Sequence, residues 1–554
     1  MFTARVRSCL WPATGFVQRM SACFLRIIIL LLTVVSAMAS ADENPLHRRI
    51  NQLLPTTAAP ADDATFLRRV FLDLAGRIPS VTEAKQFLND TSPERRKQLI
   101  DRLLDSRDYP RRMQEAFHIM LLERRGDHQE WSRFLRDSFE QNRPWDEMVR
   151  LLLKPAADDE SARGAAWFQT SRLVKEGAMA DVDVPGLTRD VGRLLAGVDL
   201  GCAQCHDDLV ISDYLQQDFQ GLQMVFENVV VRTDLGFPAV GEKLLTAPRE
   251  FSSVFEQIPR QTAIRVPGAA EVALQTFAEG EEYTVPPDRK SKFPGEPKFS
   301  PLQQVAEHLT ARENRLFAAN LVNRVWFLML GKGLVWPLDM HHSGNPSQHP
   351  QLHDLLAQEF AAHDFDLKWL LREIALTDVY QSDSTPSDPS VPVSVAELSE
   401  KRISAESLFW SVLIALEQLD PSDTERSLEQ QLAESQPLQE LQKQFLKVFA
   451  NAPKEPELLF EPTVAAALFV MHDEQVLGLL DAESSPLPRR LSQLEDAAEV
   501  VQQASLQIYS RPATEVETAE LVELLQTAAA DRRSETISQL IWAMLASTEF
   551  CVNH

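Results

Sequence analysis

Apolar residues in this chain of 554 residues recur mainly at helical spacing, and prolines interrupt the pattern. In the segment FLRRVFLDLAGRIPSVTEAKQFLND, Phe66, Val70 and Leu74 are four residues apart, as on one face of a helix. Pro79 ends that helix, and a capping box that begins at Ser80 starts the next one. The chain has only 19 Gly and 5 Tyr, a composition that disfavours a β-sandwich or barrel. The sequence therefore predicts a mainly α, multidomain helical protein.

A second segment near the C-terminus carries the same order of signals. In SRPATEVETAELV the dipeptide Arg511-Pro512 corresponds to the proline break described above, and Thr514 opens another capping box. Further on, residues 545–550 (LASTEF) resemble residues 104–109 (LDSRDY) in their pattern. We interpret these matches as a weak internal duplication of a helix–break–helix unit. Coincidence between two amphipathic helical pairs is the alternative.

Residues 1–41 have the pattern of a secretory signal peptide. A basic flank precedes the apolar run IIILLLTVV at residues 27–35, and small residues follow it, with cleavage expected after Ala39 or Ala41. Met20 is an alternative start, and an uncleaved membrane anchor is the alternative interpretation. No later segment has about 18 consecutive apolar residues. We therefore expect an exported protein of the periplasm or cell surface, with no membrane contact beyond the signal peptide.

Changes in composition divide the rest of the chain. Residues 231–300 are rich in Gly and Pro with short β-like runs among them, which indicates a loop-rich, partly β insert. The segment SDSTPSDPSVP has the composition of a linker. The predicted organisation is a signal peptide (1–41), an N-terminal helical domain (42–230), the insert (231–300), a helical domain (301–384), a linker (385–395) and a C-terminal helical domain (396–554).

The charge balance excludes some partners. The chain has 55 basic and 80 acidic residues, a formal net charge of −25. Nucleic acid and anionic lipid surfaces both attract basic patches, so we expect no nucleic-acid partner. Five cysteines are too few for a disulfide-rich scaffold. We expect redox proteins or other proteins of the cell surface as partners.

The motif with the most specific chemistry is C-x-x-C-H, at Cys202, Cys205 and His206. This spacing allows two thiols to add to the vinyl groups of a haem c, with the adjacent histidine as the proximal iron ligand. Attachment of this kind occurs in exported proteins, and the signal peptide is an independent observation that agrees. Three alternatives remain open: a small metal site such as zinc, a redox dithiol and a plain disulfide.

A methionine and two aspartates near the motif are further candidates. Met224 is a candidate sixth iron ligand, because we expect it to project away from the apolar helical face formed within residues 219–229. The alternative is a methionine that fills a gap in the core. Asp207 and Asp208 follow His206 directly, where their charge suits binding a cation or tuning a haem potential. Solvated carboxylates are the alternative.

Four of the twelve histidines fall within thirteen residues, at His341, His342, His349 and His353. His349 and His353 are four residues apart, and Pro350 is expected to occupy the first position of a helix. The spacing of this last pair suits a divalent metal or a distal haem ligand. Solvated histidines on a surface loop are the alternative.

Long stretches of the chain resemble two domains that occur together. The planctomycete cytochrome-C-like domain of unknown function resembles the stretches FLRRVFLDLAGRIPSVTEAKQFL, LIDRLLDSRDY and CAQCHDD. The planctomycete-specific domain that usually follows it resembles NRLFAANLVNRVWFLMLGKGLVWPLD, the closing LIWAMLASTEFCVNH and the motif Asn-Pro-x-x-His-Pro at residues 345–350. The resemblance covers most of residues 62–554. It implies an exported, largely helical protein of planctomycete type, and it implies no particular reaction.

On this resemblance the family's C-x-x-C-H falls on Cys202, Cys205 and His206. The family commonly continues Cys-His-Asp-His-Pro-Phe, whereas this chain has Asp208 in place of the second histidine and Leu209 in place of the proline. If that second histidine is a ligand in relatives, this protein lacks it.

The leading hypothesis for function is an exported protein that binds one c-type haem and transfers electrons. A haem-free scaffold or binding protein outside the cytoplasm, with a disulfide or small metal site at the C-x-x-C, is the alternative. An enzyme that assists the breakdown of extracellular polymers is a weaker one. The catalytic residues of any enzyme remain unknown, because a single sequence does not identify an acid–base pair among many carboxylates.

Overall fold

The protein is mainly helical, as the sequence predicts, in a computed structural model that describes residues 44–173, 182–385, 394–455, 469 and 471–554. The predicted signal peptide (1–41), the alternative start and residues 386–393 of the predicted linker lie outside the described residues. Within the described ranges, no helix has the length and the apolar character that a membrane crossing requires.

The N-terminal region is a series of helices, some of which begin at side-chain caps. Asp62 accepts a hydrogen bond from the amide of Thr65, and Ser80 with Glu83 forms the predicted capping box. The elements are α2 (Leu46–Leu53), α3 (Asp63–Leu74), α4 (Val81–Leu88), α5 (Arg95–Leu104), α6 (Asp108–Leu122), α7 (Gln129–Glu140), α8 (Trp145–Leu153), η1 (Arg163–Ala166), α9 (Trp167–Leu173), α10 (Val184–Asp190), η2 (Val191–Leu195), η3 (Cys202–Gln204) and α11 (Gln216–Glu227).

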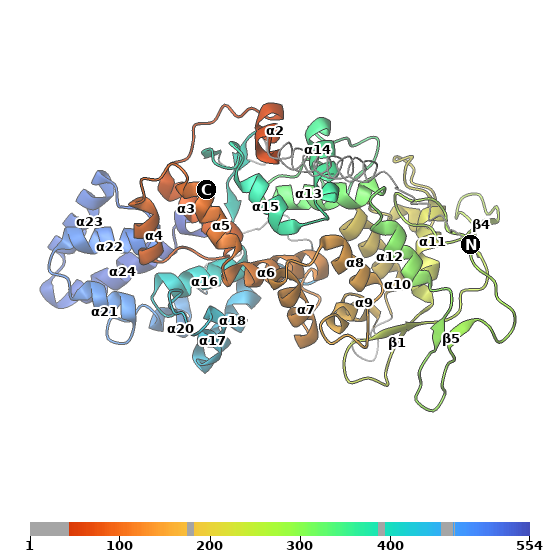
Figure 1. Ribbon diagram of the computed structural model, residues 1–554. Helices are drawn as coiled ribbons and strands as arrows, with labels where there is room; N and C mark the ends of the chain where they lie inside the picture. Colours follow the sequence, from red (N-terminus) through yellow and green to blue (C-terminus); the bar gives the residue numbers. More distant parts are fainter. Residues whose placement is uncertain (1–43, 174–181, 386–393, 456–468, 470) are drawn as a thin grey trace, which may run out of the picture.

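The segment that follows is loop-rich and partly β, as predicted for residues 231–300. Its strands are two or three residues long and form three separate antiparallel pairs, β1–β2, β3–β4 and β5–β6. They are β1 (Val229–Val231), β2 (Val240–Glu242), β3 (Arg249–Phe251), β4 (Arg260–Thr262), β5 (Tyr283–Val285) and β6 (Glu296–Pro297). Figure 1 shows these hairpins at one end of the molecule.

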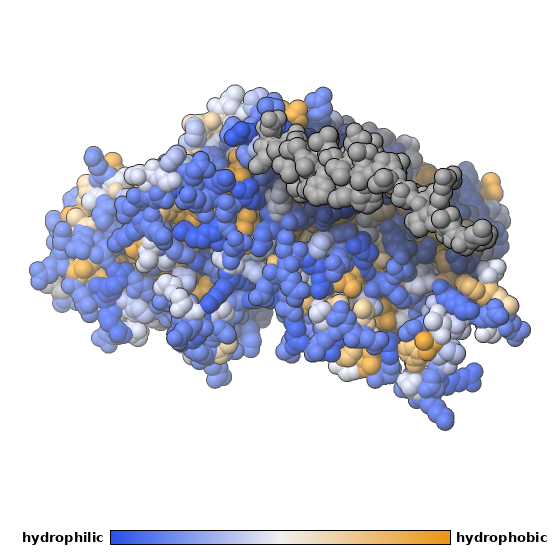
Figure 2. All heavy atoms as spheres, viewed as in Figure 1, coloured by the Kyte–Doolittle hydropathy of each residue, from blue (hydrophilic) through white to orange (hydrophobic). Residues whose placement is uncertain are grey.

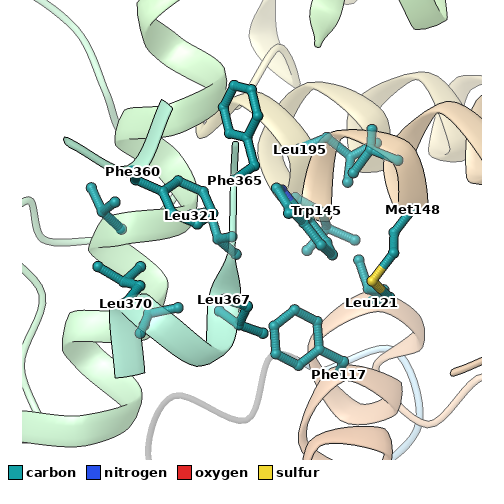
Figure 3. Close-up of a cluster of buried hydrophobic side chains, with 14 of the residues drawn as sticks. Phe117, Leu121, Trp145, Met148, Leu195, Leu321, Phe360, Phe365, Leu367 and Leu370 are labelled. Atoms are coloured by element: carbon teal, nitrogen blue, oxygen red, sulfur yellow. The ribbon is translucent and has the colours of Figure 1, made fainter. Parts of the chain in front are cut away.

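Four further helices pack into the same hydrophobic core as the N-terminal helices. They are α12 (Pro301–Leu309), α13 (Arg315–Leu330), α14 (Pro350–Ala362) and α15 (Leu367–Ala375). In Figure 3, Phe117 and Trp145 from the N-terminal helices lie among Leu321, Phe365 and Leu367 from this second group. Residues 42–230 and 301–384, which the sequence separates into two domains, therefore share one core.

The C-terminal region has its own core. Its elements are β7 (Ser384–Thr385), β8 (Leu398–Ser399), β9 (Lys401–Arg402), α16 (Ala405–Ala415), α17 (Leu428–Ala433), α18 (Gln436–Phe449), α20 (Glu474–Gly478), α21 (Pro486–Ser492), α22 (Ala497–Ile508), α23 (Glu515–Thr527), η4 (Ala530–Arg532), α24 (Arg533–Leu545), α25 (Thr548–Cys551) and β10 (Val552–Asn553). Leu72 of α3 and Ile78 also join this core, and Figure 1 shows α4 beside α22.

A buried polar network around Asp73 joins the two cores. The Asp73 carboxylate, whose residue is 2 % exposed, lies 2.7 Å from the ammonium of Lys401. It also accepts hydrogen bonds from the Tyr380 hydroxyl at 2.8 Å and from the Asn553 side-chain amide at 2.9 Å. Buried charges require such partners because water no longer solvates them. The network therefore fixes α3, the chain after α15, β9 and β10 in one arrangement.

The two segments of the predicted internal duplication share several local structural features. The order α3–α4–α5–α6 at the N-terminal end corresponds to α22–α23–α24–α25 at the C-terminal end. Gly76 (φ 63°) precedes the first break and Ser510 (φ 65°) precedes the second, so both copies have a left-handed residue there. Both predicted capping boxes form.

One arginine in each copy makes the same pair of salt bridges. Arg77 binds Glu83, six residues later, through both terminal nitrogens at 2.8 Å, and Asp108 through Nε at 2.7 Å. Arg511 binds Glu517, also six residues later, through its terminal nitrogens at 2.8 and 2.7 Å. Its Nε contacts the carboxylate of Glu549, near the start of α25, at 2.7 Å. Each arginine thus connects the break to the second and fourth helices of its own copy.

Candidate functional site

The C-x-x-C-H motif lies on the surface between the π-helical turn η2 and α11. Cys202 begins the 3₁₀ helix η3, which packs against α11, and Cys205 directly follows this helix. Cys202 and Cys205 are both exposed and carry free thiols, and the amide of Cys205 donates to the carbonyl of Cys202 at 3.4 Å. One short helical turn therefore separates two accessible thiols. No disulfide joins Cys202 to Cys205, so the structure does not agree with the disulfide alternative.

The imidazole of His206 is oriented by a backbone hydrogen bond. Its Nδ1 lies 2.7 Å from the carbonyl oxygen of Asp207. A carbonyl oxygen only accepts, so Nδ1 carries the proton and Nε2 keeps the lone pair. A backbone partner on one ring nitrogen is the common way in which proteins prepare a histidine to bind a metal through the other.

The local electrostatics disfavour a reactive thiolate. Partial burial raises the pKa of the Cys202 thiol, and the adjacent Asp208 carboxylate raises it further. The amides of Ile211 and Val210 donate to Asp208 and lower the pKa of this carboxyl group, so it stays ionised. Dithiol redox catalysts instead depend on a thiol whose pKa is lowered. The redox-dithiol alternative therefore has no support here.

The β3–β4 hairpin covers one side of the motif. The amide of Val254 donates to the carbonyl of Cys205 at 3.2 Å, and the ring of Phe255 lies 4.8 Å from the ring of His206. Arg260 forms a salt bridge with Asp207 at 3.0 Å, and the Asp207 carboxylate also accepts from the first amide of α11 at 2.8 Å. No sequence pattern indicates this contact, since the hairpin lies about fifty residues from the motif.

Exposed apolar side chains gather beside the thiols. Five of the twelve large apolar residues that are exposed in the described ranges belong to the loop after the motif or to the tip of this hairpin. We call this group the apolar rim: Leu209, Val210, Val254, Phe255 and Ile258, which are 75, 91, 59, 64 and 58 % exposed. On the face of the molecule in Figure 2, hydrophilic residues predominate and apolar ones are mostly scattered. A local concentration of this kind marks a surface that contacts another group.

The expectation that Met224 projects away from the core is wrong. Met224 is 3 % exposed and belongs to the large hydrophobic core. Helix α11 is surrounded by η3, α10, α12 and the β3–β4 hairpin, so both of its faces are buried and periodicity does not identify an outward side. The structure agrees with the alternative of a core methionine.

His349 and His353 have structural roles. His349 precedes α14, its Nδ1 accepts from the amide of Leu352 at 3.2 Å, and its Nε2 lies 3.0 Å from the carbonyl of Leu53. Both ring nitrogens are therefore used, which corrects the expectation of a metal ligand at this position. His353 is 9 % exposed, and its Nε2 donates to the carbonyl of Ala319 at 2.9 Å.

The histidine cluster lines a cavity of about 540 Å³. His341, His342 and His353 contribute to its wall, and the rings of His341 and His353 are 5.6 Å apart. Burial, with His353 and Arg324 nearby, lowers the pKa of His341 to about 3. The alternative of solvated histidines on a surface loop is wrong for His341 and His353, because both residues are buried.

The loop that follows the motif reaches this cavity. Tyr214 donates from its hydroxyl to the carbonyl of His341 at 3.2 Å, and Asp213 accepts from the amide and hydroxyl of Ser343. Asp218 also lines the cavity, and its burial raises the pKa of its carboxyl group. None of the three motif residues lines the cavity. The structure thus brings the loop after the motif to the histidine cluster and leaves the thiols outside.

No group of three or more His, Cys, Asp or Glu side chains in the described residues is arranged to hold a metal ion. A protein-only zinc site at the motif would require such a group. In contrast, a haem supplies four ligands of its own, so a single histidine with a free lone pair is enough on the protein side.

Two models of known families match parts of the chain. Residues 44–230 match the model PSCyt2, a protein of unknown function (DUF1549). Residues 303–525 match the model PSD1, also a protein of unknown function (DUF1553). The chain contains a PSCyt2 domain followed by a PSD1 domain. The C-x-x-C-H motif belongs to the PSCyt2 domain, and the histidine cluster belongs to the PSD1 domain.

The two matched domains and their order confirm the resemblance of the sequence to two domains of unknown function that occur together. Neither description states an activity. No curated protein and no solved structure matches the chain. The cavity of about 540 Å³ lies where the PSCyt2 segment around Tyr214, the insert around Gly268 and the PSD1 segment around His341 meet.

Proposed function

We propose that this protein binds one haem c through thioether bonds to Cys202 and Cys205 and transfers electrons. His206 is the proximal iron ligand. The observation that carries the proposal is the hydrogen bond from His206 Nδ1 to the Asp207 carbonyl, because it leaves the lone pair on Nε2. The free, exposed state of both thiols supports the same proposal.

The apolar rim fits a porphyrin at this place. A porphyrin presents a large flat apolar surface, and the ring of Phe255 already packs against the imidazole of His206. Burial of the rim side chains under the ring system stabilises the complex by about 25 cal/mol for each Å² of apolar surface removed from water. The rim thus offers an apolar contact for a group that the thiols attach.

A haem at this site stays partly open to solvent. Cys202 and Cys205 are exposed, and neither lines the cavity behind the loop. Covalent attachment retains such a haem without an enclosing pocket. An accessible haem edge suits electron exchange with a partner protein, and export to the periplasm or cell surface would provide the compartment for both attachment and partner.

Haem staining after denaturing electrophoresis tests the proposal. The full chain is produced in a bacterial host that matures c-type cytochromes, and the stained band is compared with that of a C202S/C205S double variant. We expect a stained band at the mass of the chain and a Soret absorption that acid–acetone extraction does not remove. Colourless wild-type protein from that host would refute it.

A further inference from the structure

A second cavity, of about 390 Å³, lies in the C-terminal region among α16, α18, α20, α24 and α25. Its wall is almost entirely apolar and includes Phe445, Phe449, Trp542 and Leu545. Apolar lining with few polar groups and a volume of several hundred Å³ is typical of sites for small apolar ligands. The PSCyt2 site and its cavity lie elsewhere and share no lining residue with it.

The first segment of the predicted duplication has a helix packed on the corresponding face. In the first copy, α5 packs against the amphipathic helix α15. Asp101 forms a salt bridge with Arg372 at 2.6 Å, and Asp105 lies 3.4 Å from the ammonium of Lys368. Leu104, between these two carboxylates, is only 3 % exposed. A basic helix thus covers the α5 face by combining apolar packing with two ion pairs.

The second copy has a different surface at the same positions. Its segment LIWAMLASTEF aligns with LIDRLLDSRDY of the first copy without a gap. Trp542 therefore replaces Asp101, and Ala546 replaces Asp105, and both line the cavity. Leu545, the counterpart of Leu104, is only partly buried. A basic helix like α15 would meet no carboxylate at these two positions, whereas an uncharged aliphatic chain fits them.

Among the described residues that line the cavity, one carries a positive charge. Arg402 contributes to the wall of the cavity. Partial burial raises the pKa of the Cys551 thiol, and the charge of Arg402 opposes that rise. Arginine is the side chain best suited to bind a carboxylate, because its guanidinium donates several hydrogen bonds in one plane. An apolar cavity with an arginine at its wall is complementary to a molecule with an aliphatic chain and a carboxylate head.

We propose that this cavity binds a medium- or long-chain aliphatic carboxylic acid. The chain lies against Trp542, Leu545 and the phenylalanines of α18, and the carboxylate pairs with Arg402. The proposal is independent of the haem at the PSCyt2 domain, since the two sites share no residue.

Fluorescence titration of the full chain with 11-(dansylamino)undecanoic acid tests the proposal. We expect the fluorescence of the probe to rise and saturate at one site per chain. Dodecanoic acid should displace the probe. Dodecan-1-ol, which lacks the charge-assisted hydrogen bond, should displace it about tenfold less effectively. The substitution Arg402→Gln should weaken the binding of the acid about tenfold and leave the binding of the alcohol unchanged. Circular dichroism and thermal unfolding verify that each variant is folded.

A pair of tryptophan substitutions on one helix provides the control. Ala546→Trp places an indole in the cavity and should abolish probe binding. Ala543→Trp adds the same side chain to an exposed position of α24 that does not line the cavity, and should leave binding unchanged. The proposal is overturned if no probe binds saturably, if A546W binds the probe normally, or if the alcohol displaces it as well as the acid.

Discussion

Nδ1 of His206 donates a hydrogen bond to the carbonyl oxygen of Asp207, 2.7 Å away. That carbonyl is itself held in place, because the Asp207 carboxylate binds Arg260 and caps the first turn of α11 through the amide of Gln216. Nε2 therefore presents a lone pair in a fixed direction beside two free thiols. The proposed haem site depends on this arrangement.

Removing the imidazole should leave the haem attached but change the iron. In His206→Ala the thioether bonds to Cys202 and Cys205 can still form, whereas the iron loses its proximal ligand. We expect a shifted Soret band that added imidazole restores toward the wild-type position. His472→Ala, at an exposed histidine far from the motif in the sequence, is the matched control and should not change the spectrum. An unchanged spectrum in the His206 variant would show that another residue binds the iron.

The buried pair of Asp73 and Lys401 should behave as a coupled unit. Asp73→Ala leaves the ammonium of Lys401 buried without its counter-charge, which typically costs about 3–5 kcal/mol of unfolding free energy. In Asp73→Ala/Lys401→Met neither charge remains, so the loss should be smaller than the sum of the two single losses. Urea unfolding of the wild type, the two single variants and the double variant measures the interaction between the two residues. Additive losses would indicate that the two groups do not interact.

The two equivalent arginines should differ in their contribution to stability. The Arg77 side chain is 4 % exposed, whereas that of Arg511 is 24 % exposed. Arg77→Ala leaves the carboxylates of Glu83 and Asp108 largely buried and should cost about 3–5 kcal/mol. Arg511→Ala should cost about 1 kcal/mol, because water screens the partners that remain. Chemical unfolding at pH 7 measures both, and equal losses would be inconsistent with this burial argument.

Stability should fall with pH below neutrality partly through His341. Burial lowers its folded-state pKa to about 3, whereas an unfolded histidine titrates near 6.5. The unfolded chain therefore binds the proton more readily, so this stabilisation is complete above pH 6.5 and is lost as the pH falls toward 3. Between pH 7 and 5 the loss from His341 is about 2 kcal/mol. Urea unfolding should show a smaller decrease in His341→Gln than in the wild type, and equal decreases would contradict this.

The features that the sequence predicted are those set by nearby residues. The helix period and the capping boxes at Ser80 and Thr514 involve contacts within a few residues, so the pattern is sufficient to place them. The duplication was visible for the same reason, since each arginine binds a glutamate six residues later. The fold class and the two-domain resemblance depended on many such local signals.

The features that the sequence did not predict depend on distant contacts. The helical period of α11, taken alone, places Met224 on an outward face, whereas neighbouring elements cover both faces of α11. The hairpin contact of Phe255 with His206 joins residues about fifty positions apart. The capping role of His349 likewise needs the carbonyl of Leu53 from another part of the chain. No spacing rule contains this information.

The most direct test of the central claim is the intact mass of the protein from a host that matures c-type cytochromes, followed by peptide mapping of the motif. The account predicts a mass increase of one haem, located on the peptide that contains Cys202 and Cys205, and no increase in the C202S/C205S variant. An unmodified mass, or a peptide in which Cys202 and Cys205 are bonded to each other, would contradict it.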